Sequence, residues 1–225
     1  MNELFWLIML AANFTAIMLC YRLWGKTGLY VWIPISVIIA NIQVTKTVML
    51  FGFEATLGNI VYATSFLATD ILNENYGKRA AAKAVGIGFF SLIIMTLFMN
   101  LAILFEPSSS DFVHDSMTEI FSLMPRIALG SLAAYGISQM HDIWAYDYWK
   151  KKRPAASFIW LRNNASTMVS QLIDSVVFTV IAFYNVFPTS VLIQIIATTY
   201  VLKWVVAAAD TPFIYLAKRW ASTSP

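Results

Sequence analysis

One apolar segment of this sequence carries acids and amides on a single helical face. Its polar and aromatic residues recur at spacings of three and four: Tyr62, Phe66, Asp70, Asn73 and Glu74. Side chains at these spacings lie on the same side of an α-helix. Carboxylates and amides there can bind the polar groups of a ligand, and the aromatic rings can pack against it. The stripe therefore predicts a small-molecule site in the interior of a helical protein.

Three other apolar segments contribute residues of the same kinds. One stripe holds Asn164, Thr167, Gln171, Asp174 and Phe178, another holds Tyr200, Lys203 and Asp210, and a third segment adds Asn41, Gln43, Thr45 and Lys46. A charge near the centre of a bilayer costs at least about 2.5 kcal/mol, so such groups must face inward and find partners. We expect these stripes to enclose one polar cavity with aromatic edges.

No enzyme signature accompanies these residues. The sequence contains no HExxH, no GxSxG, no Walker loop and no cluster of Cys or His at metal-ligand spacing. Cys20 is the single cysteine, which excludes an intrachain disulfide. We expect a protein that is not an enzyme and binds no cofactor or metal, and whose cavity serves transport or capture of a small molecule.

Composition places this cavity in a membrane protein. Hydrophobic residues make up 59% of the chain and charged residues 12%, whereas an ordinary soluble domain has about 25% charged residues. Several apolar segments reach the roughly 20 residues that a helix needs to cross the hydrocarbon layer. Because lipid offers the backbone no hydrogen-bond partner, these segments must be helices. The expected fold class is an all-α integral membrane protein, a polytopic helical bundle.

Seven crossings are expected from the apolar segments. They lie near residues 4–21, 29–51, 56–76, 82–105, 120–143, 164–187 and 189–217. The connections are too short to fold alone, so residues 1–225 are expected to form a single transmembrane domain. The end of the connection at 106–119 is mildly amphipathic and predicts a short helix along the membrane surface.

Basic residues mark every second connection of this arrangement. They are Arg22 and Lys26, then Lys78, Arg79 and Lys83, then residues 150–153 and Arg162, and finally Lys218 and Arg219. Because Lys and Arg concentrate on the cytoplasmic side, the N-terminus is predicted outside and the C-terminus in the cytoplasm. The net charge of +3 is then an orientation signal, and no nucleic-acid partner is expected.

Several of the charged residues have a structural alternative. Glu74 precedes Lys78 by four residues, so a surface ion pair and a ligand contact both remain open. Asp174 lies near mid-membrane, where a buried pair with Lys203 or Arg126 would fix helix packing. Arg126 begins a helix on the outer side and can reach the lipid headgroups.

A family resemblance rests on five sequence blocks. They are ANIQVTKTV, GNIVYATSFLATDILNENYGKRAA, RIALGSLAAYGISQ, WLRNNASTMVSQLIDS and YVLKW. Together they resemble the bacterial queuosine precursor transporter family, also called the vitamin uptake transporter family, over most of the chain from the second helix onward. The resemblance implies import of 7-deazaguanine bases across the inner membrane. It also places Asp70, Arg126, Gln139, Asp142, Asp174 and Lys203 at polar positions of the family motifs.

A deazaguanine would suit the polar stripes. Its N1–H and exocyclic amine suit a bidentate carboxylate, and its carbonyl suits an amide or a cation. Asp174 or Asp70 could accept the donors, and aromatic rings could stack on the flat base. The candidate substrate contacts are Asn41, Gln43, Lys46, Tyr62, Phe66, Asp70, Asn73, Glu74, Arg126, Gln171, Asp174, Phe178 and Lys203.

Two other functions remain open from the sequence. Without the first helix, six crossings remain with both ends inside, as in the substrate-binding components of energy-coupling-factor transporters. Residues 29–37, LYVWIPISV, show no small-xxx-small docking face, which favours a stand-alone carrier over such a subunit of an ATP-driven vitamin importer. A membrane-embedded enzyme acting on a small molecule is the other alternative. The expected partners are a small-molecule base and the lipid bilayer, with homo-oligomerisation left open.

Overall fold

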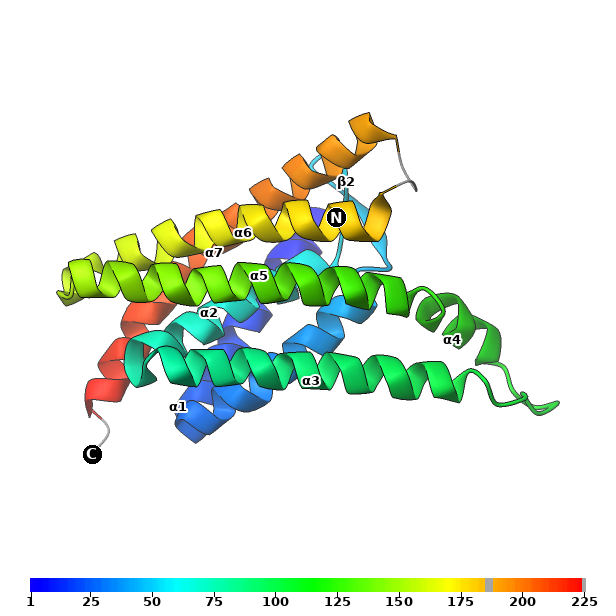
Figure 1. The fold of residues 1–225 in the computed structure, drawn as a ribbon, viewed down its shortest axis with the longest axis horizontal. Coiled ribbons are helices and arrows are strands. Elements are labelled where there is room, and N and C mark those ends of the chain that lie inside the picture. The colour runs from blue at the N-terminus through cyan, green and yellow to red at the C-terminus, as the bar shows by residue number, and fades with distance from the viewer. Residues whose placement is uncertain (185–187, 224–225) are drawn as a thin grey trace.

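The computed structural model describes residues 1–184 and 188–223, and helices dominate it (Figure 1). In chain order the elements are α1 (Asn2–Gln43), β1 (Thr47–Leu50), β2 (Phe53–Thr56), α2 (Gly58–Tyr76), α3 (Lys78–Ala102), α4 (His114–Phe121), α5 (Met124–Lys152), the 3-10 turn η1 (Ala156–Phe158), α6 (Ile159–Phe183) and α7 (Thr189–Thr223).

Five helical stretches among the described residues are long and apolar enough to cross a bilayer. They are Asn2–Gln43, Lys78–Ala102, His114–Lys152, Ala156–Phe183 and Leu192–Ala221. They support a multi-pass, helical membrane protein. The predicted count of seven crossings is not confirmed, because α1 is one continuous element across two predicted crossings and α2 is not among the five. The acids, amides and hydroxyls of α2 lower its hydropathy.

Helix α1 reverses direction at Gly25. A straight helix of its 42 residues would be about 63 Å long. Instead, the Asn2 side-chain amide donates a hydrogen bond to the carbonyl of Met49 at 3.0 Å. Gly25 has a φ of 55°, a left-handed value that a side chain disfavours. The chain therefore forms two antiparallel arms, 2–24 and 26–43 (Figure 1).

A β-hairpin replaces the end of the second predicted crossing. Helix α1 ends at Gln43, and Thr47 then pairs with Thr56 across the antiparallel strands. The prediction of one crossing over 29–51 is therefore wrong beyond Gln43. Lys46, predicted within that helix, lies exposed in the connection to β1.

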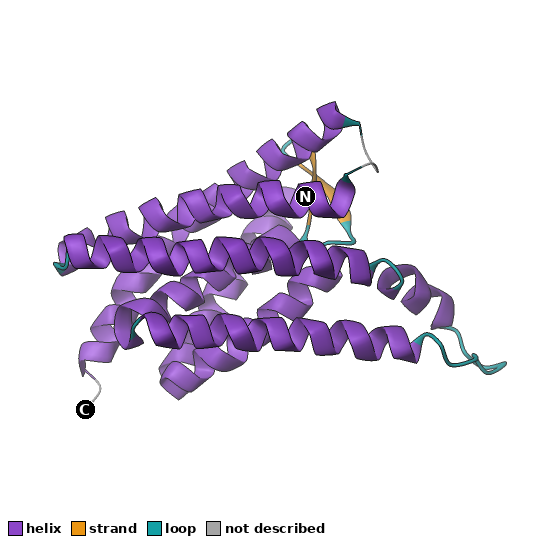
Figure 2. Cartoon of the chain, viewed as in Figure 1, coloured by secondary structure: helices purple, strands orange, loops and turns teal. Residues whose placement is uncertain are grey.

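The hairpin attaches to the N-terminal arm of α1. Its turn residues Phe51 and Gly52 have φ values of 52° and 84°, as a tight two-residue hairpin turn requires. The Phe51 N–H donates to the Glu3 carboxylate at 3.2 Å, and the Phe51 ring meets the edge of Trp6 at 6.4 Å between centroids. The two strands thus lie at the same end of the molecule as the chain start (Figure 2).

The other helices agree with the predicted crossings in place but differ in length. Helix α5 continues to Lys152 instead of ending near 143, and α6 begins at Ile159, so the predicted inner connection at 144–163 is mostly helical. The predicted end of the sixth crossing, at 187, lies outside the described residues. Helix α4 confirms the short helix predicted in the outer connection.

The interior of the bundle contains many polar and charged side chains beside its apolar core. Nearly every residue of α2 is buried, Asp70 and Glu74 included, because α1, α3 and α7 pack around it. By contrast, large apolar side chains such as Phe90, Leu97 and Phe98 of α3 are exposed. Because hydrocarbon is the surrounding solvent, this distribution suits a membrane protein.

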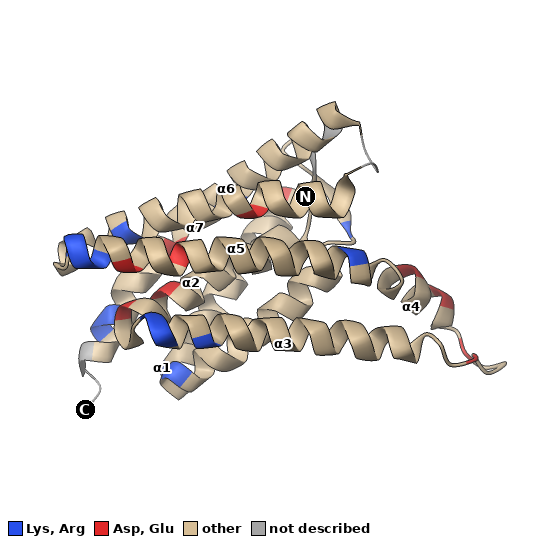
Figure 3. Cartoon of the chain, in the orientation of Figure 1, with Lys and Arg blue, Asp and Glu red and all other residues tan. Residues whose placement is uncertain are grey.

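Basic residues mark one end of the molecule. Lys and Arg gather where α5 ends, α6 begins and the α2–α3 junction lies, while acidic residues occur both on α4 and the loop before it and within the helices near the basic end (Figure 3). The basic end also contains the turn at Gly25, which lies with Tyr76 at the end of α2 and Trp220 near the end of α7. The polar stripe of α2 therefore runs along the axis that joins the two ends.

Candidate substrate-binding site

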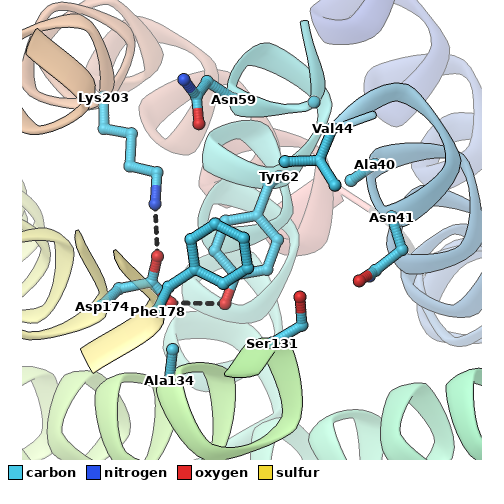
Figure 4. Close-up of a pocket in the computed structure, with 11 residues that line it drawn as sticks. Ala40, Asn41, Val44, Asn59, Tyr62, Ser131, Ala134, Asp174, Phe178 and Lys203 are labelled. Atoms are coloured by element: carbon cyan, nitrogen blue, oxygen red, sulfur yellow. Dashed lines mark hydrogen bonds and ion pairs between the residues drawn. The ribbon is translucent and has the colours of Figure 1, made fainter. Parts of the chain in front are cut away.

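Five helices meet around a pocket (Figure 4). Its walls come from the second arm of α1 and from α2, α5, α6 and α7, and are formed by Ala40, Asn41, Val44, Gly58, Asn59, Tyr62, Ser131, Ala134, Asp174, Phe178 and Lys203. Four of these helices carry a polar stripe predicted from the sequence, and each of those four contributes at least one stripe residue to the wall.

Close contact between α1 and α2 shapes one wall of this pocket. A Cβ atom at Gly58 would lie 2.4 Å from the carbonyl oxygen of Ala40, so only glycine fits. This approach brings Asn41 of α1 and Asn59 of α2 to the same wall.

A buried ion pair lies at the centre of the pocket. The Lys203 ammonium bonds to the Asp174 carboxylate, and both side chains are almost fully buried. The Tyr62 hydroxyl donates to Asp174 Oδ1 at 2.5 Å, and the Ser138 hydroxyl donates to the same oxygen at 3.2 Å. These donors stabilise a carboxylate that would otherwise be costly to bury. Of the two pairings left open by the sequence, the structure shows Asp174 with Lys203.

Aromatic rings enclose this ion pair. The Lys203 ammonium lies 4.8 Å from the centroid of the Tyr62 ring, a favourable cation–π distance. Tyr62 meets Tyr135 edge-on at 5.7 Å and Phe66 at 6.1 Å. Phe178 faces the pocket from α6. The pocket therefore offers flat apolar surfaces beside two opposite charges.

Two amides on the wall have atoms without partners among the described residues. The Asn41 Nδ2 donates to the Val37 carbonyl at 2.8 Å, which leaves its Oδ1 as an unpaired acceptor. Asn59 Nδ2 is an unpaired donor. A buried polar atom without a partner is costly, so a ligand that supplied both partners would gain stability at this wall.

The cavity between these side chains is small. Its volume is ≈ 30 Å³, room for about two water molecules. A planar base therefore needs the surrounding side chains to move, and the Asp174–Lys203–Tyr62 network is the part that closes the centre.

A second polar group lies further along α2, toward the basic end. It contains three buried carboxyl groups, Asp70, Asp142 and Asp210. The Thr167 hydroxyl donates to Asp70 at 3.2 Å, and the Asn163 amide donates to Asp210 at 2.6 Å. Asp70, a candidate substrate contact, therefore lies outside the pocket wall.

Glu74 is the centre of an ion-pair network at the basic end. Arg162 contacts its carboxylate at 2.9 Å and Lys218 at 2.8 Å, Lys150 approaches to 3.9 Å, and the Tyr146 hydroxyl donates at 3.3 Å. Three cations from three helices thus bind one buried acid.

Two sequence-based interpretations are corrected by this network. Among the described residues, the ion pairs of Glu74 do not include Lys78. Arg162, predicted to lie in a cytoplasmic connection, is a fully buried residue of α6. Its burial is tolerated because the guanidinium pairs with Glu74 and donates hydrogen bonds to the carbonyls of residues 153–155.

The pocket brings together part of the predicted set. Asn41, Tyr62, Asp174, Phe178 and Lys203 line it. Phe66 lies behind Tyr62 and Gln171 is buried one turn before Asp174, but neither is on the wall.

The other predicted contacts lie elsewhere. Gln43 is half-buried near the end of α1 and Lys46 is exposed beyond it. Asn73 donates to the carbonyl of Ile143 at 3.4 Å, beside Glu74. The exposed Arg126 donates to the carbonyl of Tyr184 at 2.9 Å, at the opposite end.

Sequence reasoning missed three polar residues of this site. Asn59 precedes Tyr62 by three residues, so extending the α2 stripe by one turn would have found it. Ser131 and Ser138 are two turns apart on α5, and their small side chains resemble ordinary packing residues in an apolar helix.

A family model described as "Putative vitamin uptake transporter" matches residues 56–217. The match covers most of the chain and includes α2, α5, α6 and the pocket part of α7. The chain belongs to the vitamin uptake transporter family. The resemblance inferred from the sequence blocks is thereby confirmed.

Three curated relatives are named as queuosine precursor transporters. A "Probable queuosine precursor transporter" of Bacillus subtilis is 44% identical over 218 residues, which is 97% of this chain and 95% of the relative. The "Queuosine precursor transporter" of Escherichia coli is 28% identical over 152 residues, 65% of this chain and 63% of the relative. A Haemophilus influenzae relative is 28% identical over 135 residues, 60% of this chain and 54% of the relative. No solved structure matches the chain.

The names of these relatives test the prediction that the protein is a transporter and not an enzyme. All three are named as transporters and none as an enzyme. The prediction of a non-enzymatic membrane transport protein is therefore confirmed.

Proposed function

We propose that the protein imports queuosine precursors, 7-deazaguanine bases such as 7-cyano- or 7-aminomethyl-7-deazaguanine, across the bacterial inner membrane. The base would bind in the pocket around Asp174. The names of the relatives support the substrate class. The observation that carries the site is the Asp174–Lys203 ion pair, buried in an aromatic-lined pocket between five helices.

The two charges of this pair match two groups of a deazaguanine. The carboxylate of Asp174 can accept hydrogen bonds from N1–H and the exocyclic amine, while the Lys203 ammonium donates to the carbonyl oxygen. Because each charge already neutralises the other, the empty pocket is stable without a ligand. The base then replaces the direct contact between them.

The rest of the wall complements the ring. Tyr62 and Phe178 offer faces for stacking, and the unpaired atoms of Asn41 and Asn59 offer one acceptor and one donor. Gln171 is buried with both polar atoms unpaired among the described residues, so a small movement of α6 would add its amide. Of the other predicted contacts, Asn73, Glu74 and Arg126 have structural partners that account for them.

We also propose the full topology. The two arms of α1, with α2, α3, α5, α6 and α7, would make seven crossings within one transmembrane domain of residues 1–225. Helix α2 can cross despite its low hydropathy, because its neighbours shield its polar side chains from lipid. The basic end would face the cytoplasm, since Lys and Arg concentrate there. The N-terminus would then be outside.

Substitution of Asp174 tests the proposed site. Asp174→Asn keeps the size of the side chain but removes the charge that would hold two donors and balance Lys203. A hydrogen bond to a charged group contributes about 1.5–3 kcal/mol, so uptake of labelled base by a precursor-auxotrophic strain should fall at least about tenfold. Asp174→Ala should abolish it.

The matched control is Asp111→Asn, which changes an exposed acid in the outer loop. Immunoblotting of membranes should show equal insertion of all variants. Wild-type uptake by an inserted Asp174→Asn protein would refute the proposed role.

A further inference from the structure

Three carboxyl groups from three helices converge below the pocket. Asp70 belongs to α2, Asp142 to α5 and Asp210 to α7, and each has at most 1% of its surface exposed. Asp70 follows Tyr62 by eight residues, about 12 Å along α2 toward the basic end. Asp70 interacts electrostatically with both other acids, so the three form one group, called here the carboxyl cluster.

No cation balances this cluster among the described residues. Lys203 forms an ion pair with Asp174. Glu74 forms ion pairs with Arg162, Lys150 and Lys218. Tyr146 of α5 interacts with Asp70 and also with Glu74 of α2 and Arg162 of α6, and His141 of α5 is next to Asp142 in the sequence. Three ionised carboxylates in this setting would repel one another without compensation.

The donors around the cluster are neutral and do not satisfy every oxygen. Asp142 faces Asp70 and the hydroxyls of Ser166, Thr167 and Ser170, whereas Asp210 Oδ2 and Asn163 Oδ1 are buried without a partner among the described residues. Asn163 is itself fully buried and directs its amide at Asp210, so its unpaired oxygen lies at the cluster. A protonated carboxyl group is a donor as well as an acceptor. Bound protons would therefore correct the charge and the missing donors together.

A metal ion is a poorer explanation for the same deficit. Within residues 1–184 and 188–223, no group of three or more Asp, Glu, His or Cys side chains is arranged to hold a metal ion. The cluster lies beside hydroxyls of Ser166, Thr167 and Ser170, which can pass protons as well as donate hydrogen bonds.

An imidazole connects the cluster to the surface of the bundle. His141 Nδ1 lies 2.9 Å from the Ser170 hydroxyl, and Ser170 is among the residues that face Asp142. The other side of His141 contacts the exposed Trp144, 5.8 Å between ring centroids. Trp144 begins the aromatic group near the basic end of α5, where an interface with water is expected. Histidine accepts and releases protons near neutral pH.

We propose that the carboxyl cluster is a proton-binding site that couples uptake of the base to proton entry, with Ser170 and His141 as its route to the cytoplasmic side. This inference rests on the proposed transport function. One proton binds a carboxylate oxygen when the site is open to the outside. The Ser170 hydroxyl donates to the Ser166 carbonyl at 2.9 Å in this structure, so it must first rotate toward His141. The bound proton then leaves when Ser170 takes it from the carboxyl group and passes its own hydroxyl proton to Nδ1 of the imidazole, which releases a proton from Nε2 to water. Only O–H and N–H bonds form and break.

The test uses the purified full-length protein in liposomes with labelled 7-cyano-7-deazaguanine as the probe. For one proton per base, an inward gradient of one pH unit should drive about tenfold accumulation. A protonophore should abolish the accumulation. The measured quantity is the ratio of uptake with the gradient to uptake without it. Asp142→Asn should lower this ratio to about one. The control Asp147→Asn, which changes an acid five residues further along α5, should keep the wild-type ratio.

Outcomes against the proposal are equally specific. Counterflow exchange by the wild type without any gradient tests transport alone, so its failure would refute the proposed function. Counterflow without a response to the pH gradient, or a response to a sodium gradient instead, would overturn proton coupling. Infrared spectroscopy is independent of transport: the wild type at neutral pH should show a protonated-carboxyl band that Asp142→Asn weakens. Absence of that band would overturn the proposal even if the variant failed to insert.

Discussion

Asp174, Lys203 and Tyr62 form a closed network in which every charge already has a partner. The carboxylate accepts from the ammonium, the phenol and Ser138. A ligand can enter only by exchanging one of these contacts for its own. In the proposed site the network would therefore act both as the recognition site and as the barrier to entry, and its hydrogen bonds would set how selective the exchange is.

Tyr62→Phe separates these two roles. The variant keeps the ring beside the ligand but loses the 2.5 Å hydrogen bond to Asp174. Because hydrogen bonds to charged groups contribute about 1.5–3 kcal/mol, we expect KM for the base to change about tenfold or more. Initial uptake rates measured over a range of base concentrations give this value.

A rise in KM would mean that Tyr62 orients the carboxylate for the base, and a fall would mean that it mainly holds the pocket closed. Tyr184→Phe, at an exposed tyrosine near the far end of α6, is the matched control. An unchanged KM in Tyr62→Phe would contradict both roles.

Helical spacing predicted the central residues of the site because they lie on faces that must avoid lipid. Tyr62, Asp174 and Lys203 each stand on a stripe that is polar in an otherwise apolar helix. Spacing cannot show which stripe meets which, so the sequence offered Glu74 a pair with the nearby Lys78 or a ligand contact, and not the pair with Arg162, which is 88 residues away. Asn59 was not predicted because it lies one helical turn before Tyr62, where the predicted stripe of α2 begins.

At the scale of elements, Glu74 binds the basic ends of four helices to one another. Its own helix α2 is joined to α5 by Lys150 and Tyr146, to α6 by Arg162 and to α7 by Lys218. The pocket, by contrast, lies toward the other end of α2. Glu74 therefore holds these helices together at the basic end. If the helices separated there to open the pocket toward the basic end, these ion pairs would have to break.

Glu74→Gln should therefore destabilise the protein strongly. The substitution leaves the fully buried Arg162 without its counter-ion, and breaking one partner of a buried ion pair typically costs about 3–5 kcal/mol. Thermal unfolding in detergent, followed by intrinsic fluorescence, should show a clear fall in the midpoint. Asp147→Asn is the control, because it removes a surface pair with Lys151 that is worth about 1 kcal/mol or less. Equal midpoints for the two variants would contradict the structural role of Glu74.

Hydropathy predicted the long helices and the breaks at 22–28 and 52–55, but not the strands beside the second break. Apolar side chains continue from α1 into the hairpin, so TVML was included in the predicted crossing over 29–51. Only the positive φ values at Phe51 and Gly52 reveal the turn. Helix α5 was predicted too short for the opposite reason: after residue 143 it becomes polar and basic, yet it continues as a helix beyond the apolar layer.

The whole molecule is polar along its axis and apolar around its circumference. The pocket, the carboxyl cluster and the Glu74 network follow one another from the hairpin end to the basic end along α2. A sequence alone indicates that such groups must lie inside. The order of the pocket, the carboxyl cluster and the Glu74 network along α2 depends on how the other helices pack around α2. The sequence of a single helix does not determine that packing.

The proposed orientation can be measured because the chain has one cysteine. In a Cys20→Ala background, Ser109→Cys in the outer loop should react with a membrane-impermeant thiol reagent in intact cells. Lys151→Cys at the basic end should react only after the cells are opened, because positive residues stay in the cytoplasm. Both side chains are exposed. The reverse labelling pattern would show that the protein is inserted the other way.

The attachment of the hairpin to the first residues of α1 has a practical consequence. Asn2 and Glu3 hold the backbone of Met49 and Phe51, and the hairpin joins the two helices that contribute Asn41 and Asn59. An affinity tag fused before Met1 would disturb this junction and, through it, ligand binding. A tag after α7 would sit at the opposite extremity (Figure 1), so purification handles and crystallisation chaperones belong at the carboxyl terminus.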